Sequence, residues 1–387
     1  MDHGSALDAV PRAAYVHVPF CRHRCGYCDF PLVAGRDDLI GNYLRAIAVE
    51  LGTVEHDTVE RRPEIDTLFF GGGTPTHLPP DRLRELFAAV LQSFDLAPGA
   101  EISVEANPLD LDDETIAVLV EAGVNRVSLG AQSFDAAALE VLERDHRPAD
   151  IADVITRLKK HGIKNRSVDL IFGVPGQSLE SWEQSLAAAA SLEVEHISTY
   201  GLTYEKGTAF WKRRDEGVLM PVDEEVDRSM YALAMQRLPE AGFEQYETSN
   251  FARAGFACRH NQVYWRGESY FAFGPGAARY IGGMRSTNHR SVTTWLTRVL
   301  AGESGVAESE TLTPEQRSRE LVMLGLRQTA GIGLDVFAER TGYRLRDLAP
   351  AAFDRFLAEG LLEEEGGRVR LAFQGRFLAD TVIAEFL

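Results

Sequence analysis

Short apolar runs rich in β-branched and aromatic residues alternate with longer stretches of helical periodicity over most of the chain. Between the apolar runs, apolar residues recur at the three- and four-residue spacing of a helix, among others over 38–54 and 112–122. Repeated strand–helix units predict a parallel sheet, and six or more in series predict a barrel or partial barrel. The predicted strands cover residues 14–20, 66–70, 101–105, 126–130, 167–172 and 196–200.

Polar and small residues stand where several of these strands end, namely at Glu105, Gln132, Asp169 and Gly201. In a parallel barrel the carboxyl ends of the strands meet at one edge, which is where such folds place their active sites. We therefore expect the functional site at this edge.

The C-terminal part of the chain has a different pattern. Residues 301–313 are small, polar and acidic and predict a linker, so that residues 1–300 form the barrel and 314–387 a separate small domain. Helices near 314–329 and 351–360, followed by a Gly366-Gly367 turn between two short strands, predict a winged-helix-like α+β arrangement. Residues 313–387 carry ten Arg, no Lys and twelve Asp or Glu, so we do not expect this domain to bind DNA.

Composition and charge narrow the class of protein. The 387 residues allow two to three domains of about 100–200 residues each. The 40 Lys and Arg against 58 Asp and Glu give a net charge of −18, which argues against a nucleic-acid partner. No run of 18 apolar residues is present, and residues 1–14 lack the apolar core of a secretory signal, so we expect a cytoplasmic protein.

Three of the four cysteines, Cys21, Cys25 and Cys28, fall within eight residues directly after the first predicted strand, and Cys258 is far away. This clustering fits neither scattered packing residues nor a disulfide framework, and it predicts a metal site in a reducing compartment.

The spacing alone leaves several sites open. A structural zinc site needs a fourth ligand, which would be His23 or Cys258. Three thiolates on a 4Fe-4S cluster would leave one iron free to bind a small molecule. A disulfide with one remaining thiol is the third alternative. Arg22 and Arg24 flank the loop, and we expect their charges to lower the pKa values of the thiols.

The CxxxCxxC spacing, with an aromatic residue before the last cysteine, resembles the radical S-adenosylmethionine (SAM) superfamily. The resemblance implies a 4Fe-4S cluster on the three cysteines, whose open iron takes the amino and carboxylate groups of SAM. It continues along the chain, although the glycine run 71–73 could also be a tight turn and each polar side chain an ordinary surface group. The positions that match SAM-binding positions of the family are Tyr15, Phe30, Gly72, Gly73, Thr74, Glu105, Gln132, Arg144 and Asp169.

Within that superfamily the chain is most similar to the coproporphyrinogen-oxidase-like branch, over roughly residues 13–385. Three features favour its HemW-type haem chaperones over its dehydrogenases. Phe30 stands where the dehydrogenases have a further cysteine, and only 20 residues precede Cys21. The segment from His260 to Trp265 matches the chaperones' HNxxYW motif.

The motif residues His260, Asn261, Tyr264 and Trp265 are the predicted haem site. Imidazole is a common ligand of haem iron, and the two aromatic rings offer flat surface to a porphyrin. The alternative for His260 is a hydrogen-bonded core histidine. Cys258 is either a haem thiolate or an inert buried side chain.

The resemblance thus implies a haem chaperone that binds haem as cargo and a SAM-ligated 4Fe-4S cluster and transfers haem to acceptor haemoproteins. Respiratory membrane enzymes as acceptors, transient membrane contact, an electron donor for the cluster and a homodimer are also implied by the resemblance. The alternative is a radical SAM enzyme acting on a porphyrin, either an oxygen-independent coproporphyrinogen III dehydrogenase or a haem-opening methyltransferase. A structural zinc or plain iron–sulfur protein is the third class.

Overall fold

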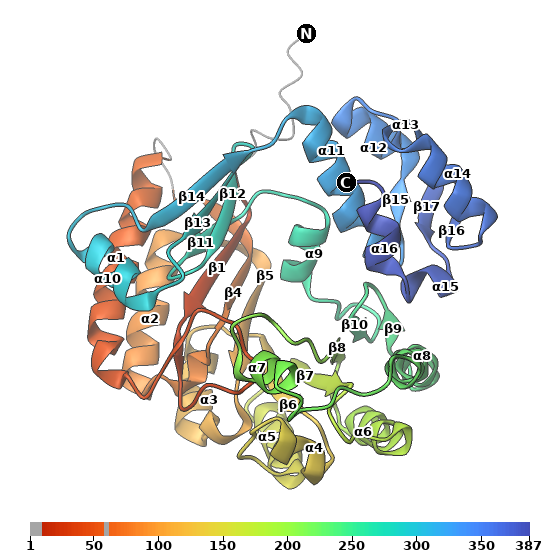
Figure 1. Ribbon diagram of the computed structural model, residues 1–387. Coiled ribbons are helices and arrows are strands. Elements are labelled where there is room, and N and C mark those ends of the chain that lie inside the picture. Colours follow the sequence, from red (N-terminus) through yellow and green to blue (C-terminus); the bar gives the residue numbers. More distant parts are fainter. Residues whose placement is uncertain (1–9, 58–61) are drawn as a thin grey trace.

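The computed structural model describes residues 10–57 and 62–387. Six parallel strands form the centre of one sheet and confirm the predicted α/β partial barrel (Figure 1). Their registers join each strand to the next along the chain, as the repeated strand–helix pattern requires. The strands are β1 (Ala13–Val18), β4 (Glu64–Gly72), β5 (Asp95–Ala106), β6 (Arg126–Gln132), β7 (Asn165–Phe172) and β8 (His196–Gly201).

The sheet extends beyond these six strands at both edges. Strand β11 (Phe271–Phe273) adds to β1 in parallel, although it comes late in the chain. At the other edge, β10 (Asn250–Ala252) runs antiparallel to β8. On its far side β10 pairs with β9 (Glu244–Gln245), which forms the edge of the sheet. Within the described residues, β11 and β9 do not pair with each other, so the barrel stays open.

Helices connect the strands and cover the outer face of the sheet (Figure 1). Their apolar sides pack on strands that are buried on both faces, which explains why the strands appear in the sequence as nearly continuous apolar runs. The covering helices are α1 (Ile40–Asp57), α2 (Pro80–Ser93), α3 (Asp113–Glu121), α4 (Ala136–Val141), α5 (Pro148–Lys160), α6 (Leu179–Ser191) and α8 (Glu224–Glu240).

A second, three-stranded antiparallel sheet lies beside the barrel. It consists of β12 (Ala278–Ile281), β13 (Met284–Asn288) and β14 (Val306–Thr311), with α10 (Val292–Leu300) between the last two strands. Strand β14 falls inside the stretch 301–313 that we expected to be a linker. Its exposed, polar side chains hid the strand, which is formed through main-chain pairing with β13.

The C-terminal domain has its own apolar core and confirms the predicted small α+β unit. Helix α11 (Pro314–Leu326) begins with a capping box between Thr313 and Gln316. The predicted glycine turn joins β16 (Leu362–Glu365) to β17 (Arg368–Leu371), with both glycines at positive φ as such a hairpin turn requires. The other elements are β15 (Ile332–Gly333), α12 (Leu334–Thr341), α13 (Leu345–Leu348), α14 (Pro350–Ala358), α15 (Phe373–Arg376) and α16 (Ala379–Ala384).

Among the described residues, we find no helix with both the length and the apolar character needed to cross a membrane.

Candidate functional site

The cysteine loop leaves the sheet at the carboxyl edge. Strand β2 (Phe20–Cys21) pairs in parallel with β3 (Val33–Ala34), and this pairing frames the loop that holds all three cysteines. Each thiol is free, Cys25 is buried, and Cys21 and Cys28 are half-buried. The predicted cluster ligands therefore lie together on one loop without a disulfide.

Polar groups from two other connections of the barrel face the thiols, one after β4 and one after α4. Arg144 Nη1 lies 3.6 Å from Cys25 Sγ, and Thr74 Oγ1 lies 3.4 Å from Cys21 Sγ. Because a guanidinium stabilises a nearby thiolate, Arg144 is suited to hold negative charge on the loop. Within the described residues its Nε has no hydrogen-bond partner, so Arg144 keeps a donor free.

The expected lowering of the thiol pKa values by Arg22 and Arg24 is wrong for Cys21 and Cys28. Burial raises the pKa of Cys21 to about 11 and also raises that of Cys28, and the nearby Arg24 only partly offsets this for Cys28. Arg22 points away to Asp110, with 3.3 Å between guanidinium and carboxylate.

Among the described residues, no three His, Cys, Asp or Glu side chains are grouped closely enough to hold a single metal ion.

Glu143 and Phe210 hold the loop in place, and neither role was predicted from the sequence. Glu143 accepts a hydrogen bond from the Gly26 amide at 2.7 Å through Oε2, and its carbonyl lies 2.7 Å from His23 Nε2. Phe210, in α7 (Ala209–Asp215), packs so tightly on Gly26 that an added Cβ would lie 2.5 Å from its ring. A side chain at position 26 would therefore displace the loop.

The glycine run 71–73, whose first two residues end β4, lets this segment approach β1 closely. An added Cβ on Gly72, which has a φ of +108°, would lie 2.3 Å from the His17 ring. One on Gly73 would lie 2.8 Å from the carbonyl oxygens of Val18 and Phe20. These close contacts show that the glycines are needed for packing of β4 against β1.

Two carboxylates lie near the ends of β5 and β7, the strands on either side of β6. Glu105 accepts a hydrogen bond from the Gly72 amide at 2.9 Å, and burial raises its pKa to about 7. Asp169 accepts hydrogen bonds from Ser198 at 2.6 Å and Ser128 at 3.1 Å, and burial raises its pKa as well. Both side chains are only half-buried, so part of each remains open to a ligand.

Gln132 and Arg144 complete the predicted strand-end set. Gln132 ends β6 after a register shift and has a φ of +62°, a backbone conformation that side chains rarely adopt and that is often found at functional sites. Arg144 donates a hydrogen bond to the carbonyl of Gly130 at 3.2 Å, and Gly130 lies at the same end of β6 as Gln132. Arg144 therefore contacts both the end of β6 and the cysteine loop.

Two other predicted SAM-binding residues have different surroundings. Phe30 is 53% exposed and lines a cavity on the outer side of the cysteine loop together with residues 290–293. None of the other predicted SAM-binding residues lines that cavity. Tyr15 stacks on Phe69 at 6.1 Å, and its hydroxyl lies 3.0 Å from His17 Nδ1.

The HNxxYW motif forms a short helix, α9 (Arg259–Trp265), which the sequence analysis did not predict. His260 is 1% exposed, and both its ring nitrogens have partners: Nδ1 lies 2.9 Å from Thr67 Oγ1 and Nε2 lies 2.8 Å from Tyr264 Oη. Burial lowers the pKa of His260 to about 3, so the ring is neutral. Ligation of iron by His260 would require one of these two contacts to break.

The other residues of this region differ in exposure. Asn261, Tyr264 and Trp265 are half-buried, and the ring nitrogen of Trp265 has no partner among the described residues. Cys258 is fully buried, lies 3.6 Å from Glu101 Oε1, and has a pKa raised by burial to about 12. These surroundings favour a neutral, packed thiol over a haem thiolate.

A column of aromatic rings joins α9 to the cysteine loop. His260 stacks on Phe69 with 5.1 Å between ring centroids, and Phe69 stacks on Tyr15. Next in the column is His17, whose Nε2 lies 2.7 Å from the carbonyl oxygen of Pro31 at the end of the loop. Because both nitrogens of His17 are engaged, it acts as a packing residue of the strand.

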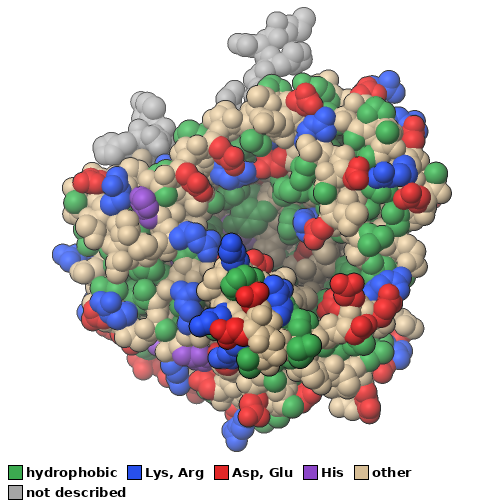
Figure 2. Space-filling view, in the orientation of Figure 1, with side chains coloured by type: hydrophobic (Ala, Val, Ile, Leu, Met, Phe, Trp, Pro, Cys, Tyr) green, Lys and Arg blue, Asp and Glu red, His purple; other side chains and the backbone are tan. Residues whose placement is uncertain are grey.

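The face of the molecule that holds these elements is hollowed at its centre. Figure 2 shows apolar side chains inside the hollow and basic side chains along part of its rim. In the orientation shared with Figure 1, the hollow lies beside α9 and over the inner side of the sheet.

Comparison with known proteins agrees with this geometry. The Radical SAM superfamily matches residues 15–189, and the HemN C-terminal domain matches residues 312–378. The heme chaperone HemW of Bacillus subtilis is 38% identical over 380 residues, which cover 97% of this chain and 99% of that protein. The heme chaperone HemW of Mycobacterium tuberculosis (strain H37Rv) is 40% identical over 388 residues, covering 98% and 96% respectively.

A solved structure supports the fold independently. The coproporphyrinogen III oxidase HemN from Escherichia coli superposes with a TM-score of 0.85 and covers 97% of this chain and 90% of its own. Its identity of 20% limits this likeness to the fold. The resemblance predicted from the cysteine loop and the HNxxYW motif is confirmed by the full-length relatives. The chain therefore belongs to the HemW family of the radical SAM superfamily.

Proposed function

We propose that this protein is a haem chaperone, which binds haem and transfers it to acceptor haemoproteins. The observation that carries the proposal is the similarity over nearly the whole chain to proteins named heme chaperone HemW, at 38–40% identity. Phe30 and the HNxxYW helix add to it, because they are the positions at which the chain departs from the dehydrogenase pattern.

The cysteine loop is the proposed binding site of a 4Fe-4S cluster, with Cys21, Cys25 and Cys28 as ligands. The fit rests on three free thiols on one loop and on a guanidinium 3.6 Å from one of them. When bound, such a cluster would supply an electron and an open iron site for SAM. The chain's own part is to hold thiolate charge with Arg144 and to keep the loop rigid through Glu143.

The proposed SAM-binding groups surround this loop. Glu105 and Asp169 offer acceptors for ligand hydroxyls, and Arg144 offers a donor for a carboxylate, since its Nε is unused within the described residues. The remaining members of the proposed set are Tyr15, Phe30, Gly72, Gly73, Thr74 and Gln132.

The proposed haem contact is α9, with His260 as iron ligand and Asn261, Tyr264 and Trp265 beside the porphyrin. Breaking the contact between His260 Nε2 and Tyr264 would expose a neutral nitrogen that can bind iron. As further parts of the proposal, the protein works in the cytoplasm with transient membrane contact, delivers haem to respiratory membrane enzymes, receives electrons from a donor protein and forms a homodimer.

An anaerobic assay of the reconstituted protein separates chaperone from enzyme. The protein is mixed in one arm with coproporphyrinogen III and SAM, and in the other with haem followed by an apo-haemoprotein. We expect haem to appear in the acceptor and no catalytic formation of protoporphyrinogen. Turnover of coproporphyrinogen, or haem that stays on the protein, would overturn the proposal.

A further inference from the structure

Helix α9 is held at its two ends by different parts of the molecule. At its beginning, Glu101 of β5 accepts hydrogen bonds from the amides of Arg259 and His260, each at 3.1 Å. A carboxylate is well suited to this position, since the first amides of a helix have no partners within it. The barrel thus fixes where α9 starts.

The C-terminal domain holds the other end. Gln328 donates to the carbonyl of Trp265 at 3.2 Å, and Arg317 donates to that of Gly267 at 2.5 Å. Arg340 donates to the carbonyls of Arg266 at 2.5 Å and of Gly267 at 2.7 Å. Three consecutive carbonyls at the end of α9, which would otherwise lack partners, are therefore bound by side chains from another domain.

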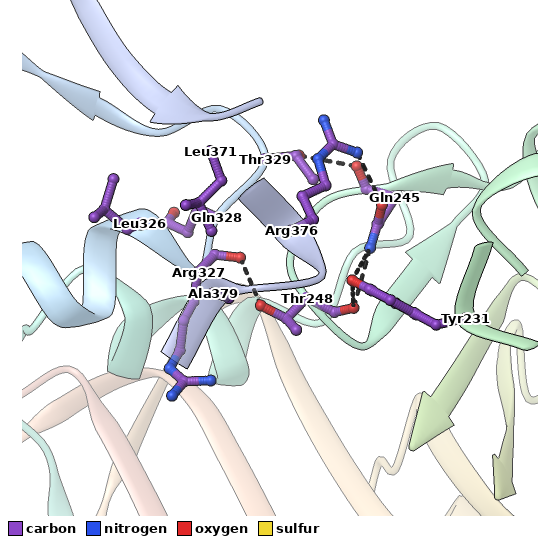
Figure 3. Close-up of a pocket in the computed structure, with 10 residues that line it drawn as sticks. All are labelled: Tyr231, Gln245, Thr248, Leu326, Arg327, Gln328, Thr329, Leu371, Arg376 and Ala379. Atoms are coloured by element: carbon purple, nitrogen blue, oxygen red, sulfur yellow. Dashed lines mark hydrogen bonds between the residues drawn. The ribbon is translucent and has the colours of Figure 1, made fainter. Parts of the chain in front are cut away.

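The backbone around Gln328 is held by the barrel. Residues 327–329 lie along residues 246–248, with main-chain bonds from Thr248 to the Arg327 carbonyl at 3.0 Å and from Thr329 to the Tyr246 carbonyl at 3.1 Å. Figure 3 shows the small cavity at this junction, with Gln245 and Thr248 facing Arg327, Thr329 and Arg376. Its volume of about 10 Å³ leaves room for no more than one water molecule.

Arg317 is itself locked in place. It is 9% exposed, pairs with Glu320 in the same helix and lies over the Tyr280 ring at 4.3 Å. Glu320 also pairs with Arg285 of β13. A cation held this firmly can orient a helix end, because moving it would break a buried ion pair.

We propose that Arg317, Gln328 and Arg340 are positioning residues for α9, so that the C-terminal domain sets how firmly the motif helix holds its cargo. The proposal rests on the proposed function, because it assigns the cargo to α9. The proposal gives the small C-terminal domain the role of positioning a helix of the barrel domain. A winged-helix-like shape would otherwise suggest contact with nucleic acid.

Arg340 and Gln328 are the residues to vary, because the Arg340 side chain is exposed and Gln328 is half-buried. Arg346→Ala is the matched control, since Arg346 is exposed and pairs with Asp354 inside the same domain at 2.7 Å. Arg317 is left intact because its loss would leave Glu320 buried without its charge partner in α11. Three quantities are measured on the full chain with its cluster: amide hydrogen exchange, haem affinity and SAM affinity.

In Arg340→Ala and Gln328→Ala we expect amides 263–268 to exchange faster and haem affinity to fall, each by about tenfold, which corresponds to about 1.4 kcal/mol. SAM affinity should stay unchanged. Arg346→Ala should change all three quantities by less than about twofold, because an exposed ion pair contributes little. Arg340→Lys, which keeps a cation and one donor, should recover part of the loss.

Two results would overturn the proposal. One is exchange of amides 263–268 at the wild-type rate in both variants, which would mean that the domain does not hold α9. The other is faster exchange with unchanged haem affinity, which would mean that the position of α9 does not matter to the cargo. A wild-type protein that takes up no haem would refute the proposed function itself, and the exchange rates would show this to be a separate failure.

Discussion

The cysteine loop and the motif helix α9 are equally visible in the sequence, yet their structures prepare them differently. In the loop, the chemical groups are uncommitted: the thiols are free, and Arg144 keeps an unused donor within the described residues. In α9, His260 has partners on both ring nitrogens and is almost fully buried. Under the proposed function, the cysteine loop could take its ligands as it stands, whereas α9 would have to exchange one hydrogen bond before His260 could bind iron.

The largest expected effect is that of a cysteine substitution in the loop on cluster binding. Cys25→Ala removes one of the three proposed cluster ligands, so we expect complete loss of cluster absorbance after anaerobic reconstitution. Cys258→Ala is the control and should keep the full cluster, because Cys258 is buried beside Glu101. An intact cluster in Cys25→Ala would contradict the ligand assignment.

A substitution in the motif helix α9 should lower the stability of the protein. His260→Ala deletes a buried ring and leaves Thr67 and Tyr264 without their partner, so we expect the free energy of unfolding to fall by about 3 kcal/mol. The measurement is urea unfolding of the protein without ligands. A loss below about 1 kcal/mol would mean that His260 does not hold α9 against β4.

Glu105 should make stability depend on pH. Its pKa is raised to about 7 in the folded chain, so the folded state binds the proton more tightly than the unfolded state. The contribution of Glu105 to the free energy of unfolding is therefore fully present below about pH 4.5 and is lost as the pH rises through 7. Glu105→Gln, which can still accept from Gly72, should be more stable than wild type by about 3 kcal/mol at pH 8 and equal to it at pH 4.

Thermal unfolding of both proteins across this range measures that difference. The comparison cancels the other buried carboxylates, which are present in both proteins. An equal difference at pH 4 and pH 8 would mean that Glu105 is not the group that titrates.

The smallest effect concerns the hydroxyl that engages His260. Tyr264→Phe removes that hydroxyl but keeps the ring, so stability should fall by only about 1 kcal/mol. Because Nε2 then has no competing partner, haem affinity should rise by up to about tenfold. Haem titration measures this change, and a loss of affinity would argue against ligation through Nε2.

The sequence predicted those parts of the fold and site that depend on local pattern. Apolar runs located the six parallel strands, and residue spacing located the cysteine loop. Strand β14 was missed because its side chains are polar and its pairing partner is set by main-chain contacts. The state of His260 was also beyond reach, since Thr67 lies 193 residues away in sequence and only the folded chain brings them together.

The charges on the cysteine loop show the same limit. Arg22 and Arg24 stand beside the cysteines in sequence, but Arg144, from the distant connection between α4 and α5, is the guanidinium that approaches a thiol. Likewise, Arg317 and Arg340 gave no sign of contacting the end of α9, because they belong to another domain. Contacts between domains depend on how two folded units pack, which local spacing does not encode.

The most direct test is whether the cysteine loop and α9 are separate sites, and it compares two variants by two measurements. Wild type, Cys25→Ala and His260→Ala are each reconstituted anaerobically, and cluster content and haem affinity are determined for all three. We predict that Cys25→Ala loses the cluster and still binds haem, and that His260→Ala keeps the cluster and loses haem binding. Haem binding by His260→Ala at wild-type affinity would contradict the assignment of the cargo to α9.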